Sequence, residues 1–376
     1  MIESNRHQRV SYATDNAPGE QDDEIAMGET VRVGVVGLGR MGRFHAANLA
    51  GRIPGARLVR IADAVEDAAR ENAARLGGVE WSTRYEDMLE DPEVEAVVVA
   101  SPTPLHAEMA AAAAAAGKHV FCEKPISLEL ERTWQVIEAV RAACVRLQVG
   151  FQRRFDPDYL AAKEKISGGH IGEVYLFRTT LRDMRSPGFD YIKGSGGFFA
   201  DVTVHDFDAA RWLIGEITEV SAAGAALSDP GFEEVGDIDN AVITLRFASG
   251  ALEVIDNSRT AGYGYECSSE ILGHRGTLRI DNHRRVAVET LIPGRTCQDY
   301  VSDFVERFAD AYRGGDGALR PRRARRGGAS TQRDRRRSRH RSRPGRRVLP
   351  SRGENCPPKA RDQRRRDLLR GGRLEP

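Results

Sequence analysis

Between residues 31 and 149 the chain alternates short β-branched runs with alanine-rich stretches, and no other feature restricts its fold as strongly. The runs have the length of strands and the stretches have helical periodicity, so the pattern predicts strand-helix-strand units around a parallel sheet. One expected helix, 106–116, is followed by Gly117, a residue suited to a left-handed helix end. We therefore expect a doubly wound α/β domain over residues 30–150, with strands at 31–36, 58–62, 96–100, 119–122 and 147–149.

After Gly150 strand-like runs dominate, and only two helical stretches appear, at 157–166 and 204–214. The turn Ala248-Ser249-Gly250 separates two alternating runs, which is a hairpin signal, and hairpins join antiparallel strands. Residues 151–313 are therefore predicted to form an α+β domain on a large, mostly antiparallel sheet. Its strands are expected at 174–182, 220–227, 240–247, 251–259, 266–272 and 277–280.

The two ends of the chain differ from this body. Residues 1–29 are polar and lack apolar periodicity, so we expect a disordered leader and a natural translation start at Met27. No run reaches the roughly 18 apolar residues of a membrane span, and no secretory signal precedes residue 31. A cytoplasmic protein without membrane contact is expected. Residues 314–376 carry 22 basic groups against six acids and no aromatic residue, which predicts an arginine-rich disordered tail.

Two explanations of this tail compete. An arginine-rich arm would bind nucleic acid in a salt-sensitive way. Alternatively, codons allowed by degeneracy, read one base further on, turn residues 314–326 into AEMERFVRAVRDG and residues 334–347 into TGGDRAIALALAAG. Both strings have helical patterns. We favour a frameshift near Arg313 over a nucleic-acid partner; codons in the gene that are incompatible with these peptides would reject it.

Six residues directly after the first expected strand form a glycine-rich turn that opens a helix, the context of a dinucleotide-binding fingerprint. The first glycine permits a tight turn, the second lets the backbone approach a pyrophosphate, and the third packs the helix against the sheet. The helix N-terminus attracts the phosphates. The cofactor-binding residues expected here are Gly37, Leu38, Gly39, Arg40, Met41 and Gly42.

Asp63 ends the second expected strand, about 20 residues beyond the fingerprint, where a carboxylate accepts hydrogen bonds from ribose hydroxyls. It would repel a 2′-phosphate, and the following Ala64 and Val65 offer no cation. We therefore expect NAD as the cofactor in preference to NADP.

Two further groups of residues have the chemistry of a catalytic site. Lys124 follows Glu123 after the strand 119–122, at the edge of the sheet where ligands bind, although a solvated loop lysine is the simpler explanation. Asp201, His205 and Asp208 are spaced to share one face of a helix. Histidine exchanges protons with alcohols near neutral pH, and a carboxylate can orient its ring. A helix-start aspartate and a partly buried histidine would also explain this pattern.

The five cysteines include no Cys-x-x-Cys pair, and no paired-histidine spacing accompanies them. We therefore expect no metal site.

Five motifs in order resemble those of the Gfo/Idh/MocA oxidoreductase family, and most closely those of its inositol 2-dehydrogenases. The similarity spans residues 31–313. It implies a Rossmann domain joined to an α+β domain whose open sheet often mediates dimers or tetramers, so a homodimer or homotetramer is expected. The motifs are the fingerprint, Ser101-Pro102-Thr103-Pro104-Leu105-His106, Glu123-Lys124-Pro125, residues 150–156 (GFQRRFD) and Asp201-x-x-x-His205.

The resemblance also implies roles for residues. Lys124, Asp201 and His205 match the family's catalytic lysine, aspartate and histidine, with Asp201 holding His205 in register. Leu181 stands where some inositol dehydrogenases have a substrate-contacting histidine. Further cofactor-binding residues are expected at Ser101, Thr103, His106 and Glu123, and substrate-binding residues at Lys124, Arg153, Asp208 and Tyr265.

The expected activity is NAD-dependent oxidation of a ring hydroxyl of a cyclic polyol or sugar, with myo-inositol converted to 2-keto-myo-inositol. A dehydrogenase of another sugar or sugar acid is the alternative within the same chemistry. An NAD-binding module with a basic nucleic-acid-binding tail is the alternative of another class, and a gel shift at rising salt would distinguish it.

Overall fold

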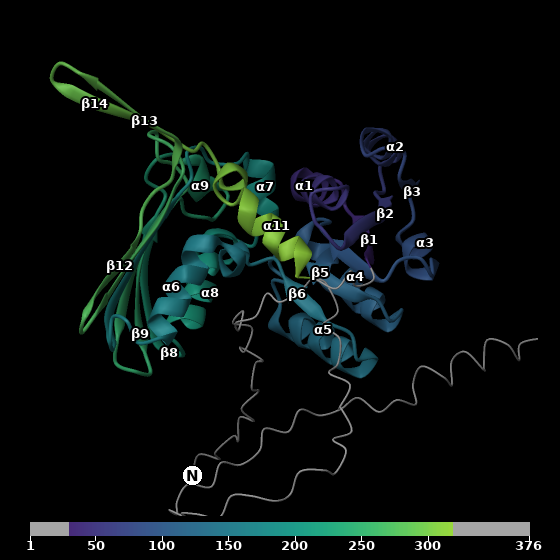
Figure 1. Cartoon of the computed structure of the whole chain (residues 1–376), viewed down its shortest axis with the longest axis horizontal. Coiled ribbons are helices and arrows are strands. Elements are labelled where there is room, and N and C mark those ends of the chain that lie inside the picture. Colours follow the sequence, from purple (N-terminus) through teal and green to yellow (C-terminus); the bar gives the residue numbers. More distant parts are fainter. Residues whose placement is uncertain (1–29, 319–376) are drawn as a thin grey trace, which may run out of the picture. The chain divides into compact units, whose positions relative to one another are not determined.

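The computed structural model describes residues 30–318 (Figure 1). The expected leader, the Met27 start and all but the first five residues of the expected tail lie outside this range. The first domain confirms the doubly wound prediction, with a six-stranded parallel sheet in the order β3-β2-β1-β4-β5-β6. Its strands are β1 (Val31–Val36), β2 (Ala56–Ala62), β3 (Glu80–Ser82), β4 (Ala96–Val99), β5 (His119–Cys122) and β6 (Leu147–Val149).

Helices cover both faces of this sheet, which is why its central strands are apolar throughout. One buried cluster includes residues of α1 and α2, and the other includes residues of α4 and α5. The strand order reverses between β1 and β4, and a crevice at such a switch point is where ligands bind in doubly wound folds. The helices are α1 (Arg40–Leu49), α2 (Glu66–Arg75), α3 (Tyr85–Glu90), α4 (Thr103–Ala115) and α5 (Leu130–Ala143).

The second domain is built on a six-stranded sheet in the order β12-β11-β7-β10-β9-β8. Its neighbours are antiparallel except β7 and β10, which run parallel. The predicted hairpin is confirmed, because β9 and β10 pair around Gly250, whose φ is 90°. The strands are β7 (Val174–Arg182), β8 (Ile217–Ala225), β9 (Asn240–Phe247), β10 (Leu252–Ser258), β11 (Glu266–Gly273) and β12 (Gly276–Ile280).

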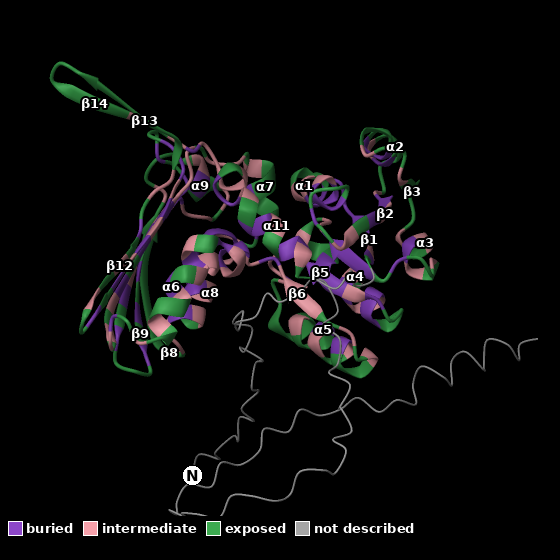
Figure 2. Ribbon diagram, in the orientation of Figure 1, coloured by how far each residue is buried: buried purple, intermediate pink, exposed green. Residues whose placement is uncertain are grey.

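The described helices of this domain cover one face of the sheet. Buried and non-buried residues alternate along β9 and β11, and the buried ones join residues of α6 (Pro157–Ser167) and α8 (Val204–Leu213) in one cluster. Figure 1 shows both helices on the same side of the sheet. A hairpin that the sequence did not predict, β13 (Arg284–Ile292) with β14 (Arg295–Tyr300), is almost wholly exposed (Figure 2).

After this hairpin the chain returns to the first domain through α10 (Phe304–Arg307) and α11 (Ala309–Gly317). The end of α11 packs on α1, and Gly315 O accepts a hydrogen bond from Gln148 Nε2 at 2.9 Å. The helix thus continues beyond the boundary that we expected after residue 313. Residues 314–317 have a place in the fold because their backbone and Asp316 meet polar partners in the first domain.

Only glycine fits at two positions of the turn between β1 and α1. Gly37 has a φ of 85°, and a Cβ there would lie 2.5 Å from Ser101 N. A Cβ at Gly42 would overlap the carbonyl oxygen of Gly37, whereas a Cβ at Gly39 would meet nothing within 4 Å. Gly37 and Gly42 are therefore required by the fold, and Gly39 is not.

We predict that Gly42→Ala lowers the free energy of unfolding by about 3 kcal/mol, the upper end of overpacking costs, because the new methyl group collides with backbone. Gly39→Ala is the matched control and should change stability by less than about 0.5 kcal/mol. Urea denaturation followed by circular dichroism measures both. Equal stability of the two variants would contradict this account of the turn.

Candidate active site

The start of α1 offers unoccupied backbone donors at the switch point. Its N-cap residue, Gly39, provides no side-chain cap, and the space beyond its Cα is open. The Asp63 carboxylate accepts hydrogen bonds from Leu38 N at 2.7 Å and from Val65 N at 2.9 Å, so it fixes the glycine-rich turn from the end of β2. An open helix N-terminus of this kind suits a phosphate group.

The loop after β4 lies beside this turn. The Oγ atom of Ser101 is buried and has no hydrogen-bond partner among the described residues. Thr103 begins α4, and His106 bridges two loops, with Nε2 2.7 Å from Ser101 O and Nδ1 2.8 Å from Pro125 O. An orphaned hydroxyl next to an open helix N-terminus fits the polar edge of a bound dinucleotide.

Two fingerprint residues direct their side chains toward the second domain. Arg40 Nη2 donates to Asp303 Oδ2 at 2.7 Å, and its guanidinium lies 4.7 Å from the ring centre of Phe304. Met41 packs against the core cluster of the second domain. Their side chains therefore join the two domains, which spacing within the fingerprint could not indicate.

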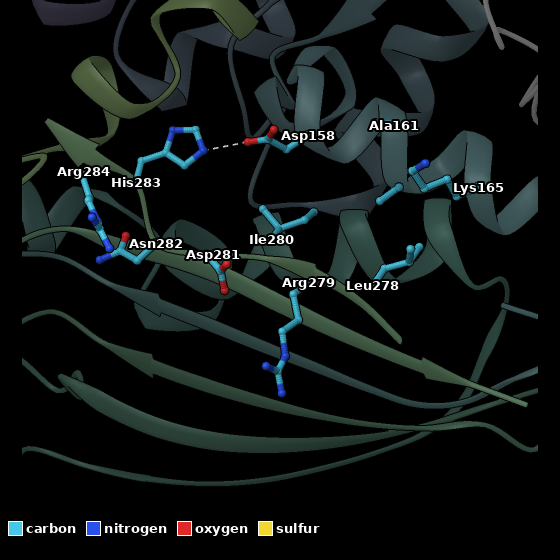
Figure 3. Close-up of a pocket in the computed structure, with 11 residues that line it drawn as sticks. Asp158, Ala161, Lys165, Leu278, Arg279, Ile280, Asp281, Asn282, His283 and Arg284 are labelled. Atoms are coloured by element: carbon cyan, nitrogen blue, oxygen red, sulfur yellow. Dashed lines mark hydrogen bonds and ion pairs between the residues drawn. The ribbon is translucent and has the colours of Figure 1, made fainter. Parts of the chain in front are cut away.

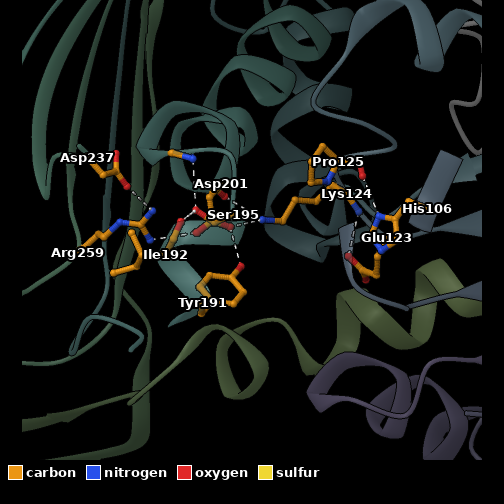
Figure 4. Close-up of polar contacts among 11 residues, drawn as sticks. His106, Glu123, Lys124, Pro125, Tyr191, Ile192, Ser195, Asp201, Asp237 and Arg259 are labelled. Atoms are coloured by element: carbon orange, nitrogen blue, oxygen red, sulfur yellow. Dashed lines mark hydrogen bonds and ion pairs between the residues drawn. The ribbon is translucent and has the colours of Figure 1, made fainter. Parts of the chain in front are cut away.

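The expected catalytic lysine and aspartate meet across the two domains (Figure 4). Lys124 Nζ donates to Asp201 O at 2.8 Å and to Asp201 Oδ1 at 3.1 Å. The Tyr191 hydroxyl donates to Oδ1 at 2.8 Å, and Arg259 Nη1 donates to Oδ2 at 3.0 Å. Burial acts to raise the pKa of Asp201, but Lys124 and Arg259 hold it below its ordinary value, so the carboxylate is ionised at neutral pH.

His205 lies near the same lysine but has a different electrostatic state. Burial and the positive charges of Lys124 and Arg153 hold the pKa of His205 well below its ordinary value. Its ring packs edge-on against Phe151, with ring centres 6.2 Å apart, and its Nδ1 is buried without a partner among the described residues. At neutral pH His205 is therefore a neutral imidazole able to accept a proton.

Asp201 does not hold His205, contrary to the expectation from their spacing. All hydrogen-bond partners found for the Asp201 carboxylate are on Lys124, Tyr191 and Arg259. Asp201 lies in a π-helical turn, η2 (Phe199–Thr203), and His205 lies in the regular helix that follows. Lys124, Tyr191 and Arg259 reach the Asp201 carboxylate from other parts of the chain and engage both of its oxygens. Asp201 instead orients Lys124.

The residues expected to bind substrate are buried or hydrogen-bonded to other side chains. Arg153 is 2% exposed, and its Nη1 donates to Asp206 at 2.6 Å while Nε and Nη2 have no partner among the described residues. Both oxygens of Asp208 accept hydrogen bonds from Arg154 at 2.8 Å. Tyr265 is buried in the core of the second domain. Spacing in the sequence did not indicate the ion pairs of Arg153 with Asp206 and of Asp208 with Arg154.

Leu181 is buried in the same core as Tyr265 and offers no polar group to a substrate. The hydroxyl of Tyr263, two residues before Tyr265, contacts Arg182 and Glu266.

Sequence reasoning missed Asp183 and Arg259. They follow β7 and β10, whose parallel pairing sets Arg182 opposite Ser258. Burial raises the pKa of Asp183 to about 6, against the opposing charge of Arg259. The signal that could have found both residues was the shared edge of a parallel pair, which requires knowing that β7 and β10 are neighbours.

The carboxylate of Glu123, which we expected to bind the cofactor, is hydrogen-bonded to protein groups in the interior. Its Oε1 lies 2.8 Å from Nε2 of His45, and the other ring nitrogen, Nδ1, lies 2.6 Å from Asp316 Oδ1. Burial alone would lower the pKa of His45, but the carboxylates of Asp316 and Glu123 raise it to about 10. A buried imidazolium therefore sits between two carboxylates at neutral pH.

A concavity lies elsewhere in the second domain, between α6 and the end of β12 (Figure 3). It has a volume of about 370 Å³, and His283 is hydrogen-bonded to Asp158 at its rim. None of the expected site residues lines it. This concavity is therefore separate from the group of residues that the sequence predicts as the site.

We predict that His45→Gln lowers the free energy of unfolding by about 3–5 kcal/mol at pH 7, because two buried carboxylates lose their counter-charge. The folded pKa of His45 is raised, so its stabilising contribution is full below about pH 6.5 and is lost as the pH rises through about 10. Denaturant titrations of wild type and variant should therefore converge above pH 10. His170→Gln, at an exposed position, is the control, and a gap independent of pH would contradict a buried imidazolium.

Known proteins resemble both domains. Residues 31–151 match the family described as "Oxidoreductase family, NAD-binding Rossmann fold", and residues 159–279 match the family described as "GFO/IDH/MocA C-terminal domain". Within residues 30–318, no helix combines the length and apolar character that would be needed to cross a membrane.

Individual relatives extend the match over most of the chain. The myo-inositol 2-dehydrogenase of Thermotoga maritima is 45% identical over 284 residues, which cover 75% of this chain and 85% of that protein. The scyllo-inositol 2-dehydrogenase (NAD(+)) of Bacillus subtilis is 41% identical, over 76% of this chain and 84% of that protein.

A solved structure agrees with these matches. The crystal structure of scyllo-inositol dehydrogenase from Lactobacillus casei, with bound NAD(H) and scyllo-inositol, has a TM-score of 0.73 and 31% identity, covering 77% of this chain and 88% of that one. The chain belongs to the Gfo/Idh/MocA family of oxidoreductases, and its first domain is an NAD-binding Rossmann fold.

Proposed function

We propose that this protein is an NAD-dependent dehydrogenase that oxidises a ring hydroxyl of a cyclic polyol, with myo-inositol converted to 2-keto-myo-inositol. The observation that carries the proposal is the pairing of Lys124 from the first domain with Asp201 from the second, four residues before His205, whose pKa the Lys124 charge helps to lower. The inositol dehydrogenases among the relatives support the substrate class.

The residues around the glycine-rich turn fit NAD. The open N-terminus of α1 at Gly39 suits the pyrophosphate, and Asp63 supplies the acceptor for ribose hydroxyls. The Ser101 hydroxyl, which has no partner in the described part of the chain, is available to the same ligand. Ala64 and Val65 provide no cation for a 2′-phosphate, which favours NAD over NADP. Bound NAD supplies the acceptor for a hydride from the substrate carbon.

The protein's own groups handle the proton and the charge. The neutral His205 ring accepts the hydroxyl proton, and the Lys124 ammonium stabilises the negative charge that develops on that oxygen. Asp201, fixed by Arg259, holds Lys124 in place. The substrate loses one proton to His205 and one hydride from the adjacent carbon, and the remaining electron pair closes the C=O bond.

Substrate recognition is assigned to groups that retain hydrogen-bonding capacity beside this centre. Two nitrogens of Arg153 have no partner within residues 30–318, and its charge acts on His205, so it remains our candidate for a polyol contact. Asp208 and Tyr265 are held by other interactions, so contact with substrate would require each to move.

The uncovered face of the second sheet supports a homodimer or homotetramer. Side chains with large apolar groups are exposed on its strands and on the β13–β14 hairpin, namely Tyr175, Val220, Val242, Leu252, Leu272, Val288 and Leu291. Several large exposed apolar side chains on one sheet favour an interaction surface there. A cytoplasmic location, with its supply of NAD, completes the proposal.

We expect NAD reduction with myo-inositol or scyllo-inositol to exceed that with glucose at least about tenfold in kcat/KM, because a pocket built for a ring of hydroxyls loses hydrogen bonds when their pattern changes. Absorbance at the NADH band measures all three reactions with the full chain. Glucose as the best substrate would reject inositol and retain the dehydrogenase chemistry.

Lys124→Met should reduce kcat by at least about 100-fold, because the oxyanion loses its cation, and should leave the Kd for NAD within about twofold. Fluorescence titration gives the Kd, and initial rates give kcat. Lys193→Met, on the exposed face of α7 (Phe189–Gly194), is the matched control. A Lys124→Met enzyme with near-normal kcat would end this assignment.

A further inference from the structure

A continuous row of polar groups connects the last described helix to the proposed catalytic lysine. Asp316 Oδ1 lies 2.6 Å from His45 Nδ1, and His45 Nε2 lies 2.8 Å from Glu123 Oε1. The other oxygen of Glu123 accepts a hydrogen bond from the backbone N–H of Lys124 at 3.2 Å. The row thus runs from α11 through α1 to the loop that follows β5.

This row is buried and fully paired on its carboxylates. His45 and Asp316 are 0% exposed and Glu123 is 8% exposed. The remaining oxygen of Asp316 accepts a hydrogen bond from Asn48 Nδ2 at 3.2 Å, so all four carboxylate oxygens have a donor. Two carboxylates cost much free energy to bury, and a plain domain contact would not require them.

The row ends at the backbone N–H of Lys124, the proposed catalytic lysine. The Glu123 carboxyl group is confined from two directions. Gly150 packs against it so closely that a Cβ there would lie 2.9 Å away, and His45 Nε2 contacts its Oε1. On the other side of Lys124, His106 Nδ1 contacts Pro125 O at 2.8 Å. The segment from 123 to 125 is thereby fixed at both ends, while the Lys124 side chain reaches across to Asp201.

From this geometry we infer that Glu123, held by the His45–Asp316 pair, is a positioning residue for Lys124. The inference rests on the proposed function of Lys124. Asp316 fixes the His45 ring, the ring fixes the Glu123 carboxylate, and that carboxylate fixes the backbone from which the lysine extends. Loss of any member would leave the amine present but misplaced, which lowers kcat far more than cofactor binding.

The test compares Glu123→Gln and Asp316→Asn in the full chain. Glutamine keeps the shape of Glu123 but cannot accept hydrogen bonds from both His45 and the Lys124 N–H. We expect about 10- to 100-fold lower kcat with Glu123→Gln, a smaller loss with Asp316→Asn, and a Kd for NAD within about twofold of wild type. Rates are normalised to NAD-binding sites so that any unfolded fraction is not counted.

Asp310→Asn is the matched control, because this exposed residue of α11 pairs only with Arg313 among the described residues. It should retain wild-type kcat. Variants that lose thermal stability but keep kcat per site would overturn the positioning role and leave a structural anchor. Unchanged kcat and stability would overturn it as well. A wild-type enzyme that oxidises no polyol would instead contradict the proposed function, and this inference with it.

Discussion

An ion pair between Lys124 and Asp201 joins the two domains, and the chemistry of the site depends on it. The carboxylate is shared between the lysine of one domain and Arg259 of the other, with Tyr191 donating to the same oxygen as the lysine. A buried pair of charges contributes little net stability but strongly penalises the loss of either partner. The Asp201 carboxylate therefore both positions Lys124 and joins the two domains at the site.

Much of the fold could be predicted from the sequence, because burial on one or both faces of a sheet leaves a clear pattern. The apolar runs of β1 and β5 and the alternation of β9 ended where expected. The β13–β14 hairpin was missed because it is exposed on both faces, so burial imposes no period on it. The parallel pairing of β7 with β10, seventy residues away in the chain, left no local signal at all.

The site residues show the same difference between local patterns, which the sequence reveals, and long-range contacts, which it does not. The glycine-rich turn, Asp63 and Lys124 lie at the carboxyl ends of parallel strands, a position that strand order alone makes functional. The partners of Asp208 and Glu123 are determined by which opposite charge folding brings near, and neither Arg154 nor His45 is marked by spacing. The sequence thus identified candidate residues with suitable functional groups. It could not show which of those groups are already paired with other side chains in the folded protein.

The π turn at η2 carries a consequence for chain length. A π turn holds one more residue than the α-helical turn it replaces. A single-residue deletion within Phe199–Thr203 would replace it by an α-helical turn of nearly the same total rotation, so the flanking segments would keep their directions. Asp201 lies inside the turn, so its carboxylate would then extend from a shifted point of the backbone relative to Lys124 and Arg259. In this stretch the number of residues is constrained as tightly as their identity.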